Sequence, residues 1–276
     1  MKLPPSGRIF VIVIAVAAAA LAVAWLALAG MPARAAAPCV TSAQYGSCGP
    51  YPSPSKGLPR PAPATVNNDM WGCGVNGPCG PETLTSRGPG SWQVTSDQPP
   101  LVHGNEQVLT FPDVWQPMRL PSGADPQVRS FAMLRSGWAE ASPRGAGNSY
   151  EAAYDMFFTN NADGRVRELM IWVDDLGHGF PGATLLGHAA YYGQRFTVYG
   201  YPSGEVIFSM DRNTPRGTAH ILSALLWMNS HRLLSLNARI TSLYFGWEIC
   251  STGGRAETFT LSKFTITARC EPGTSC

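Results

Sequence analysis

The chain has 276 residues, seven cysteines and a formal net charge of +2. Three basic residues and no acidic residue lie in residues 1–35, so removal of that segment changes the formal net charge to −1. A nearly neutral chain has no broad attraction for phosphate backbones, which excludes nucleic acid as the expected partner.

Residues 1–35 have the composition of a targeting segment. Lys2 and Arg8 give a basic start, residues 9–30 are apolar, and Ala33-Arg34-Ala35 offers the small–x–small pattern of a signal peptidase site. The alternative is an uncleaved membrane anchor, because roughly 20 apolar residues span a bilayer. Both interpretations place the rest of the chain outside the cytoplasm. We therefore expect a secreted protein, attached to a membrane only if this segment is retained.

Residues 36–64 contain seven prolines, which indicates an extended linker or an arm stapled by disulfides. Outside the cell, cysteines favour disulfide bonds. We expect four of them to pair among themselves and Cys250 to pair with Cys270 or Cys276; the four are Cys39, Cys48, Cys73 and Cys79. One cysteine is left over. No spacing resembles a zinc site, so no metal is expected.

From about residue 65 onwards, short alternating apolar runs are interrupted by Gly, Pro, Asn and Asp at close intervals. This texture is typical of many short strands in an all-β sandwich. We expect one domain over residues 65–276, a two-sheet antiparallel β jelly roll. Residues 218–234 carry apolar side chains at helical spacing, which predicts one helix packed on the outside of the sandwich.

Two neighbouring segments each place a carboxylate on an unusual strand face. In residues 152–158 alternation puts Asp155 with Ala153 and Phe157, and in residues 167–173 it puts Glu168 with Met170 and Trp172. A short polar loop separates the segments, which predicts a hairpin with Asp155 beside Glu168. Indole rings such as that of Trp172 can stack on sugar rings.

A third segment, residues 242–249, places Tyr244, Gly246 and Glu248 on one face. We expect Gly246 to leave room for a ligand beside the carboxylate. Glycoside hydrolysis needs two carboxyl groups, one ionised and one protonated, flanking the bond that breaks. Glu168 and Glu248 on one curved sheet are candidates for that pair.

These segments resemble glycoside hydrolase family 12. The family's nucleophile strand reads Glu-Leu/Ile-Met-Ile-Trp, and its other motifs read Ala-Tyr-Asp-Leu/Ile-Phe, Phe-Gly-x-Glu and Asn-Asn-x-Trp-Gly. The matching segments are Glu168-Leu169-Met170-Ile171-Trp172, Ala153-Tyr154-Asp155-Met156-Phe157, Phe245-Gly246-Trp247-Glu248 and Asn68-Asp69-Met70-Trp71-Gly72. The resemblance spans roughly residues 66–269 and keeps the order of the family's motifs.

The resemblance implies a jelly roll with an open cleft on its concave sheet, and endo-hydrolysis of β-1,4-glucans with retention and no cofactor. It implies that Glu168 is the nucleophile, that Glu248 is the acid/base and that Asp155 hydrogen-bonds the nucleophile. The substrate-binding residues that it implies are Trp71 and Trp172 as sugar platforms, with Met170, Asn68 and Asp69. Asp69 replaces an Asn of the family and Ile249 replaces a Pro, which affects substrate preference more than chemistry.

Two rivals to this function stay open. One is a non-catalytic module that binds glucan, and the other is a hydrolase that prefers xyloglucan or mixed-linkage glucan. We expect a monomer whose partner is a polysaccharide. Other candidate residues receive ordinary interpretations: His178 is placed to line the cleft, the core holds Trp92, Trp115, Trp138 and Trp227, and solvent surrounds Glu106, Glu140, Glu151 and Glu205.

Overall fold

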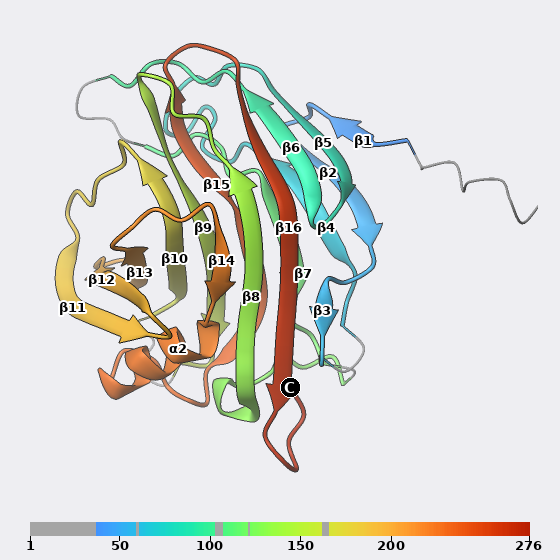
Figure 1. The fold of residues 1–276 in the computed structure, drawn as a ribbon, viewed down its shortest axis with the longest axis vertical. Coiled ribbons are helices and arrows are strands. Elements are labelled where there is room, and N and C mark those ends of the chain that lie inside the picture. The colour runs from blue at the N-terminus through green and yellow to red at the C-terminus, as the bar shows by residue number, and fades with distance from the viewer. Residues whose placement is uncertain (1–36, 59–60, 103–106, 121, 162–165) are drawn as a thin grey trace, which may run out of the picture. The chain divides into compact units, whose positions relative to one another are not determined.

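The computed structural model describes residues 37–58, 61–102, 107–120, 122–161 and 166–276. In these residues two β-sheets pack face to face as a sandwich (Figure 1). The expected signal or anchor segment, residues 1–35, lies outside the described residues, as does Glu106. Nowhere in the described ranges is there a helix with the length and apolar character needed to cross a bilayer.

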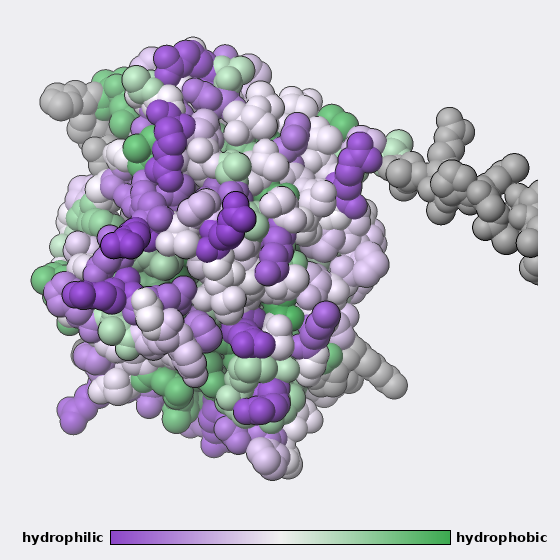
Figure 2. Space-filling model, viewed as in Figure 1, coloured by the Kyte–Doolittle hydropathy of each residue, from purple (hydrophilic) through white to green (hydrophobic). Residues whose placement is uncertain are grey.

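One sheet has seven strands, and its strand order and bounds are β1 (Cys39–Thr41), β5 (Glu82–Gly88), β6 (Ser91–Ser96), β16 (Glu257–Cys270), β8 (Phe131–Ala141) and β14 (Arg216–Ala219), with β3 (Ser55–Lys56) beside β16. The outward face of β8 and β16 is in front in Figure 1. Figure 2 shows hydrophilic residues scattered over this face among near-neutral ones, as expected for a solvent-facing sheet.

The other sheet has nine strands, in the order β11 (Thr184–Tyr191), β12 (Gln194–Gly200), β13 (Glu205–Met210), β10 (Glu168–Leu176), β9 (Asn148–Thr159), β15 (Arg239–Thr252), β7 (Asp113–Pro117), β4 (Ala64–Asp69) and β2 (Tyr45–Tyr51). The expected all-β, two-sheet jelly-roll sandwich is confirmed. Two strand pairs depart from the antiparallel pattern, because β10–β13 and β16–β3 are parallel.

Large apolar side chains fill the space between the sheets. Trp138, Trp247 and Tyr154 are among the largest fully buried ones. Trp92 meets Trp247 edge-on with ring centroids 5.1 Å apart, a favoured aromatic geometry. The core role predicted for Trp92 and Trp138 is thus confirmed. Trp227 is partly buried against the same core.

The described residues contain one α-helix, α2 (Ile221–Ser230), which packs on β8 and β11 (Figure 1), and a short 3-10 helix, Val128–Ser130. The buried residues of α2 are Ile221, Ala224, Leu225 and Met228, so most of the predicted aliphatic stripe is core, but Leu226 is 47% exposed and its predicted core position is wrong. The predicted range, 218–234, was too long. Residues 216–219 form the edge strand β14 instead, and Arg232 has a left-handed backbone (φ 60°) that stops a helix from continuing.

Residues 36–64, for which the sequence indicates a linker or a stapled arm, hold β1, β2 and β3 and the disulfide Cys39–Cys48. Further disulfides join Cys73 to Cys79 and Cys270 to Cys276. The expected bond from Cys250 to Cys270 or Cys276 is therefore wrong. Cys250 is buried in β15 of the nine-stranded sheet, whereas Cys270 ends β16 in the other sheet, next to the C-terminal turn.

Strand β10 contains a β-bulge. Trp172 pairs with Ala153, but Asp174 pairs with the adjacent Ala152, so β10 has one residue more than β9 over this stretch. A bulge of this kind turns the following side chains to the opposite face. As a result Asp174 is buried between the sheets and is 1% exposed.

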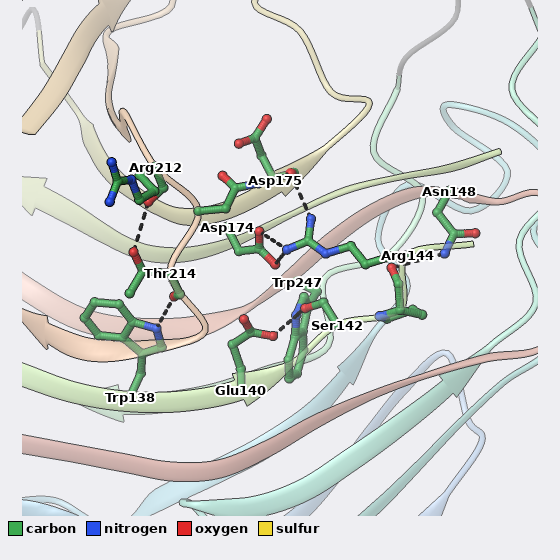
Figure 3. A network of polar contacts seen from close by, with 12 residues as sticks. Trp138, Glu140, Ser142, Arg144, Asn148, Asp174, Asp175, Arg212, Thr214 and Trp247 are labelled. Atoms are coloured by element: carbon green, nitrogen blue, oxygen red, sulfur yellow. Dashed lines mark hydrogen bonds and ion pairs between the residues drawn. The ribbon is translucent and has the colours of Figure 1, made fainter. Parts of the chain in front are cut away.

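Asp174 belongs to a polar network between the sheets (Figure 3). Arg144, from the loop between β8 and β9, donates to both carboxylate oxygens of Asp174 at 2.5 and 2.6 Å. Beside this pair, Trp247 donates its Nε1–H to Ser142 at 2.8 Å, and Ser142 donates to Glu140. Glu140 is 7% exposed, so its expected solvation is wrong.

Arg144→Ala should lower the free energy of unfolding by about 2 kcal/mol, because it leaves the Asp174 carboxylate buried without its cation. The loss stays below the roughly 3–5 kcal/mol of a fully buried pair, since the Arg144 side chain is 48% exposed. Urea denaturation measures it. Arg195→Ala is the control, because the exposed Arg195–Asp211 pair contributes at most about 0.5 kcal/mol. Equal losses in the two variants would contradict the account.

Candidate functional site

Three adjacent strands bring the predicted carboxylates onto one face of the nine-stranded sheet. On the central strand β9, Asp155 lies opposite Met170 of β10 and Tyr244 of β15. Side chains two residues apart share a face, so Glu168 and Glu248 lie on the same side as Asp155. This is the side away from the core residues of β10, Leu169, Ile171 and Val173. The predicted hairpin of β9 and β10 is confirmed.

Asp155 and Glu168 are hydrogen-bonded to one another through their side chains. Asp155 is 3% exposed, and burial, followed by the charges of Glu168 and Glu248, raises its pKa well above the usual value. Burial also raises the pKa of Glu168, but the hydrogen bond from Asp155 lowers it. Within the pair, Asp155 therefore holds a proton more strongly than Glu168 does.

Glu248 is partly exposed on this face of the sheet. Burial of its carboxyl group raises its pKa well above the usual value, and the nearby negative charges of Glu151 and Glu168 add to this shift. A carboxyl group in such surroundings keeps its proton near neutral pH. Glu168 and Glu248 thus lie on the same face of the sheet, and Glu248 is in surroundings that favour its protonated form.

The sequence interpretation missed two further acids on this face. Glu151 lies opposite Glu248 in the sheet register and is 0% exposed, so its expected solvation is wrong. Glu205 lies on β13, opposite Glu168 of β10, and is partly buried. Burial, followed by the charges of Glu168 and Glu248, raises the pKa of Glu205 to about 8. The signal for Glu151 was its spacing, four residues before Asp155 and hence on the same face.

A cavity of about 250 Å³ lies beside Glu248 and Glu205, and Trp71, His178 and Tyr201 also line it. Trp71 is 40% exposed, which leaves its indole ring open to a ligand. His178 lines the cavity as the sequence suggested. In the part of the chain that the structure describes, no group of three or more His, Cys, Asp or Glu is placed to hold a metal ion.

Trp172 does not offer the open ring that the sequence suggested. Its side chain is 3% exposed and stacks on His178 and Phe180, with ring centroids 5.1 and 4.8 Å away. Phe180 in turn stacks on Tyr199 at 4.0 Å. The loop after β10 therefore covers most of this ring, and only a small part of Trp172 lines the cavity. Met170 is also buried, at 1% exposure.

Three residues near Trp71 and Glu248 have surroundings that the sequence did not reveal. Asn68 is 0% exposed and donates its amide to the backbone oxygen of Ala43, so it does not reach the groove. Asp69 is partly buried, and burial raises its pKa. A Cβ on Gly246 would lie 2.1 Å from the backbone oxygen of Pro112, so glycine is required by the neighbouring chain segment and not by a ligand.

An aromatic patch continues along the face beyond Asp155. Phe157 is 38% exposed and meets Tyr244 edge-on, with centroids 5.8 Å apart, and Tyr244 stacks on Trp115 at 6.3 Å. Trp115 is partly exposed, so the prediction of a core role was wrong. Aromatic faces on both sides of the carboxyl groups suit an elongated ligand with apolar ring faces.

No protein-family model matches the chain, and no curated protein matches its sequence. Solved structures do match. The xyloglucanase domain of NopAA from Sinorhizobium fredii, in complex with cellobiose, has a TM-score of 0.65 and 22% identity, over 84% of this chain and 99% of that chain. Endoglucanase 3 of Trichoderma harzianum has a TM-score of 0.65 and 19% identity, over 86% and 100% of the two chains.

A family 12 xyloglucanase from Bacillus licheniformis is similar to the same degree, with a TM-score of 0.64 and 17% identity over 84% of this chain and 100% of that chain. At sequence identities this low, the structural similarity shows a shared fold and nothing more specific. The strand order of the two sheets and these likenesses together show that the chain has the fold of glycoside hydrolase family 12.

Proposed function

We propose that this protein is a secreted, endo-acting hydrolase of β-1,4-glucans that works with retention through a glycosyl-enzyme intermediate. The observation that supports it most is the convergence of Asp155, Glu168 and Glu248 on one face of three adjacent strands. The hydrogen bond from Asp155 favours the ionised form of Glu168, and burial with the neighbouring charges favours a proton on Glu248, which supports the proposal. Retaining glycosidases require this division between two carboxyl groups.

In the first step, the Glu168 carboxylate attacks the anomeric carbon, and the bond to the leaving oxygen breaks as Glu248 gives that oxygen its proton. Asp155 keeps Glu168 oriented through their hydrogen bond. In the second step, the Glu248 carboxylate takes a proton from water, the water oxygen attacks the anomeric carbon, and Glu168 leaves as a carboxylate.

The substrate class follows from the shape and chemistry of the face. An exposed indole at Trp71 and the patch of Phe157, Tyr244 and Trp115 flank the carboxyl groups. Such rings suit the flat faces of β-linked glucose units. Similar structures include both endoglucanases and xyloglucanases, so xyloglucan is the second candidate substrate.

The remaining parts of the proposal concern export. Residues 1–35 direct the chain out of the cytoplasm, and residues 65–276 carry the activity. Disulfides at Cys39–Cys48, Cys73–Cys79 and Cys270–Cys276 support an oxidising compartment, because such bonds do not persist in the cytosol. The protein works as a monomer.

A reducing-sugar assay over cellulose, xyloglucan and barley-type glucan tests the proposal, with Glu168→Gln as the inactive control. Viscosity that falls faster than reducing ends appear supports endo cleavage. Proton NMR of the first products should show the β-anomer, which retention requires. Binding of glucan without new reducing ends would instead establish the non-catalytic module.

Trp71→Ala should raise KM for glucan about tenfold, since stacking of this kind is worth about 1.5 kcal/mol, with no change in Tm. Trp172→Ala should instead lower the free energy of unfolding by about 3 kcal/mol, because its ring is buried. Steady-state kinetics and thermal melts of both variants separate the two effects. A Trp71→Ala enzyme with unchanged KM would show that Trp71 is not a platform.

A further inference from the structure

The groove contains a buried carboxyl group that the proposed mechanism does not use. Glu151 lies on β9, on the face of Asp155, and directly opposite Glu248 on β15. It is 0% exposed, and its side chain is hydrogen-bonded to that of Glu248. Two carboxyl groups can share such a bond only when one of them carries a proton.

His178 contacts the same carboxyl group of Glu151. It belongs to the loop after β10, and its Nδ1 is in contact with Oε2 of Glu151. The His178 side chain is 10% exposed, and its ring stacks on Trp172. Burial raises the pKa of Glu151 to about 8, but its contact with Glu248 lowers it, whereas the same contact adds to the raised pKa of Glu248, so the shared proton stays on Glu248.

We propose that Glu151, held by His178, is a positioning residue that orients Glu248 and keeps the proton on it until the leaving oxygen accepts it. This inference rests on the proposed role of Glu248 as acid/base. The proton passes from Glu248 to the glycosidic oxygen in the first step and returns to Glu248 from water in the second. Glu151 neither gains nor loses a proton in the cycle.

Several charged groups face this pair from β9, β10 and β13 and from the loop after β10. They are Asp175 and Glu168 on β10, Asp155 on β9, Glu205 on β13 and His178 in the loop. Apart from burial, Glu151 raises the pKa of Glu248 most, whereas the positive charge of His178 lowers it. Removal of either partner should therefore move the pKa of Glu248, and in opposite directions.

Glu151→Gln keeps the size of the side chain and removes its charge. The alkaline limb of kcat/KM for glucan should move about one pH unit lower, because Glu248 then loses its proton more readily. Hydrolysis of glucan at neutral pH should fall about tenfold, while dinitrophenyl β-cellobioside, whose leaving group needs no proton, should lose less than about twofold. Glu82→Gln is the matched control, since Glu82 is equally buried but lies on β5 of the other sheet.

His178→Phe retains a ring against Trp172 and removes the contact with Glu151, so the alkaline limb should move to higher pH. This variant also decides the question if Glu151→Gln does not fold. The proposal is overturned if the limbs of both variants coincide with that of the wild type, if they move in the same direction, or if Glu151→Gln loses equal activity on both substrates. A wild-type protein that cleaves neither substrate would instead overturn the function on which the proposal rests.

Discussion

Glu168→Gln should lower kcat for glucan hydrolysis by about 10⁴-fold or more, because the variant lacks the nucleophile that forms the glycosyl-enzyme. Its stability should change by less than about 1 kcal/mol. Glu168 is partly exposed on the groove face, and its hydrogen-bond partner Asp155 already carries a proton, so an amide can replace the carboxylate without leaving a buried charge. Steady-state kinetics and a thermal melt measure both quantities.

A trapping experiment gives an independent check on the nucleophile. A fluorinated cellobioside with a good leaving group slows the second step more than the first, so the covalent intermediate accumulates. Mass spectrometry of wild-type peptides should find one fluorocellobiosyl group on the peptide that contains Glu168, and no adduct in Glu168→Gln. An adduct on Asp155 or Glu205 would move the nucleophile to that residue.

Glu248→Ala should lower kcat/KM for glucan by about 10²–10⁴-fold, which is the usual contribution of a general acid. The first step with dinitrophenyl β-cellobioside should survive, because that leaving group departs without a proton. Hydrolysis of the intermediate should then limit the rate, since no carboxylate remains to activate water.

Azide tests the same variant from the other direction. A small anion can enter the space that Glu248→Ala opens and attack the intermediate without a general base. Added azide should therefore raise turnover of the aryl substrate and give a β-glycosyl azide. The role of Glu248 is contradicted if azide has no effect and if the loss is the same on glucan and on the aryl substrate.

Alternation along single strands was sufficient to predict much of the site. Asp155, Glu168 and Glu248 share a face because each lies in a regular stretch where period two holds and the opposite side chains are apolar. The hairpin of β9 and β10 followed from the short polar loop between them. These are local properties, and the chain encodes them over a few residues.

Properties that depend on distant segments could not be obtained in the same way. Trp172 is buried because a loop with Phe180 and His178 folds over it, and no periodicity reports a loop conformation. In the sequence, Glu151 has the pattern of a surface residue, because its contacts with His178 and Glu248 form only in the folded protein. The partner of Cys270 depended on which sheet holds β15, which the sequence did not reveal.

The extra residue in β10 has a consequence for anyone who recombines this chain with another. The extra residue reverses the alternation of side chains along β10. Even-numbered side chains point to the groove before the bulge, and odd-numbered ones do so after it. If β10 paired with β9 without a bulge, Val173 would lie opposite Ala152 and Asp174 would face the groove, which would leave Arg144 without its carboxylate. A chimera that exchanges this strand must therefore carry residues 168–176 together with the loop that contains Arg144, as one inseparable cassette.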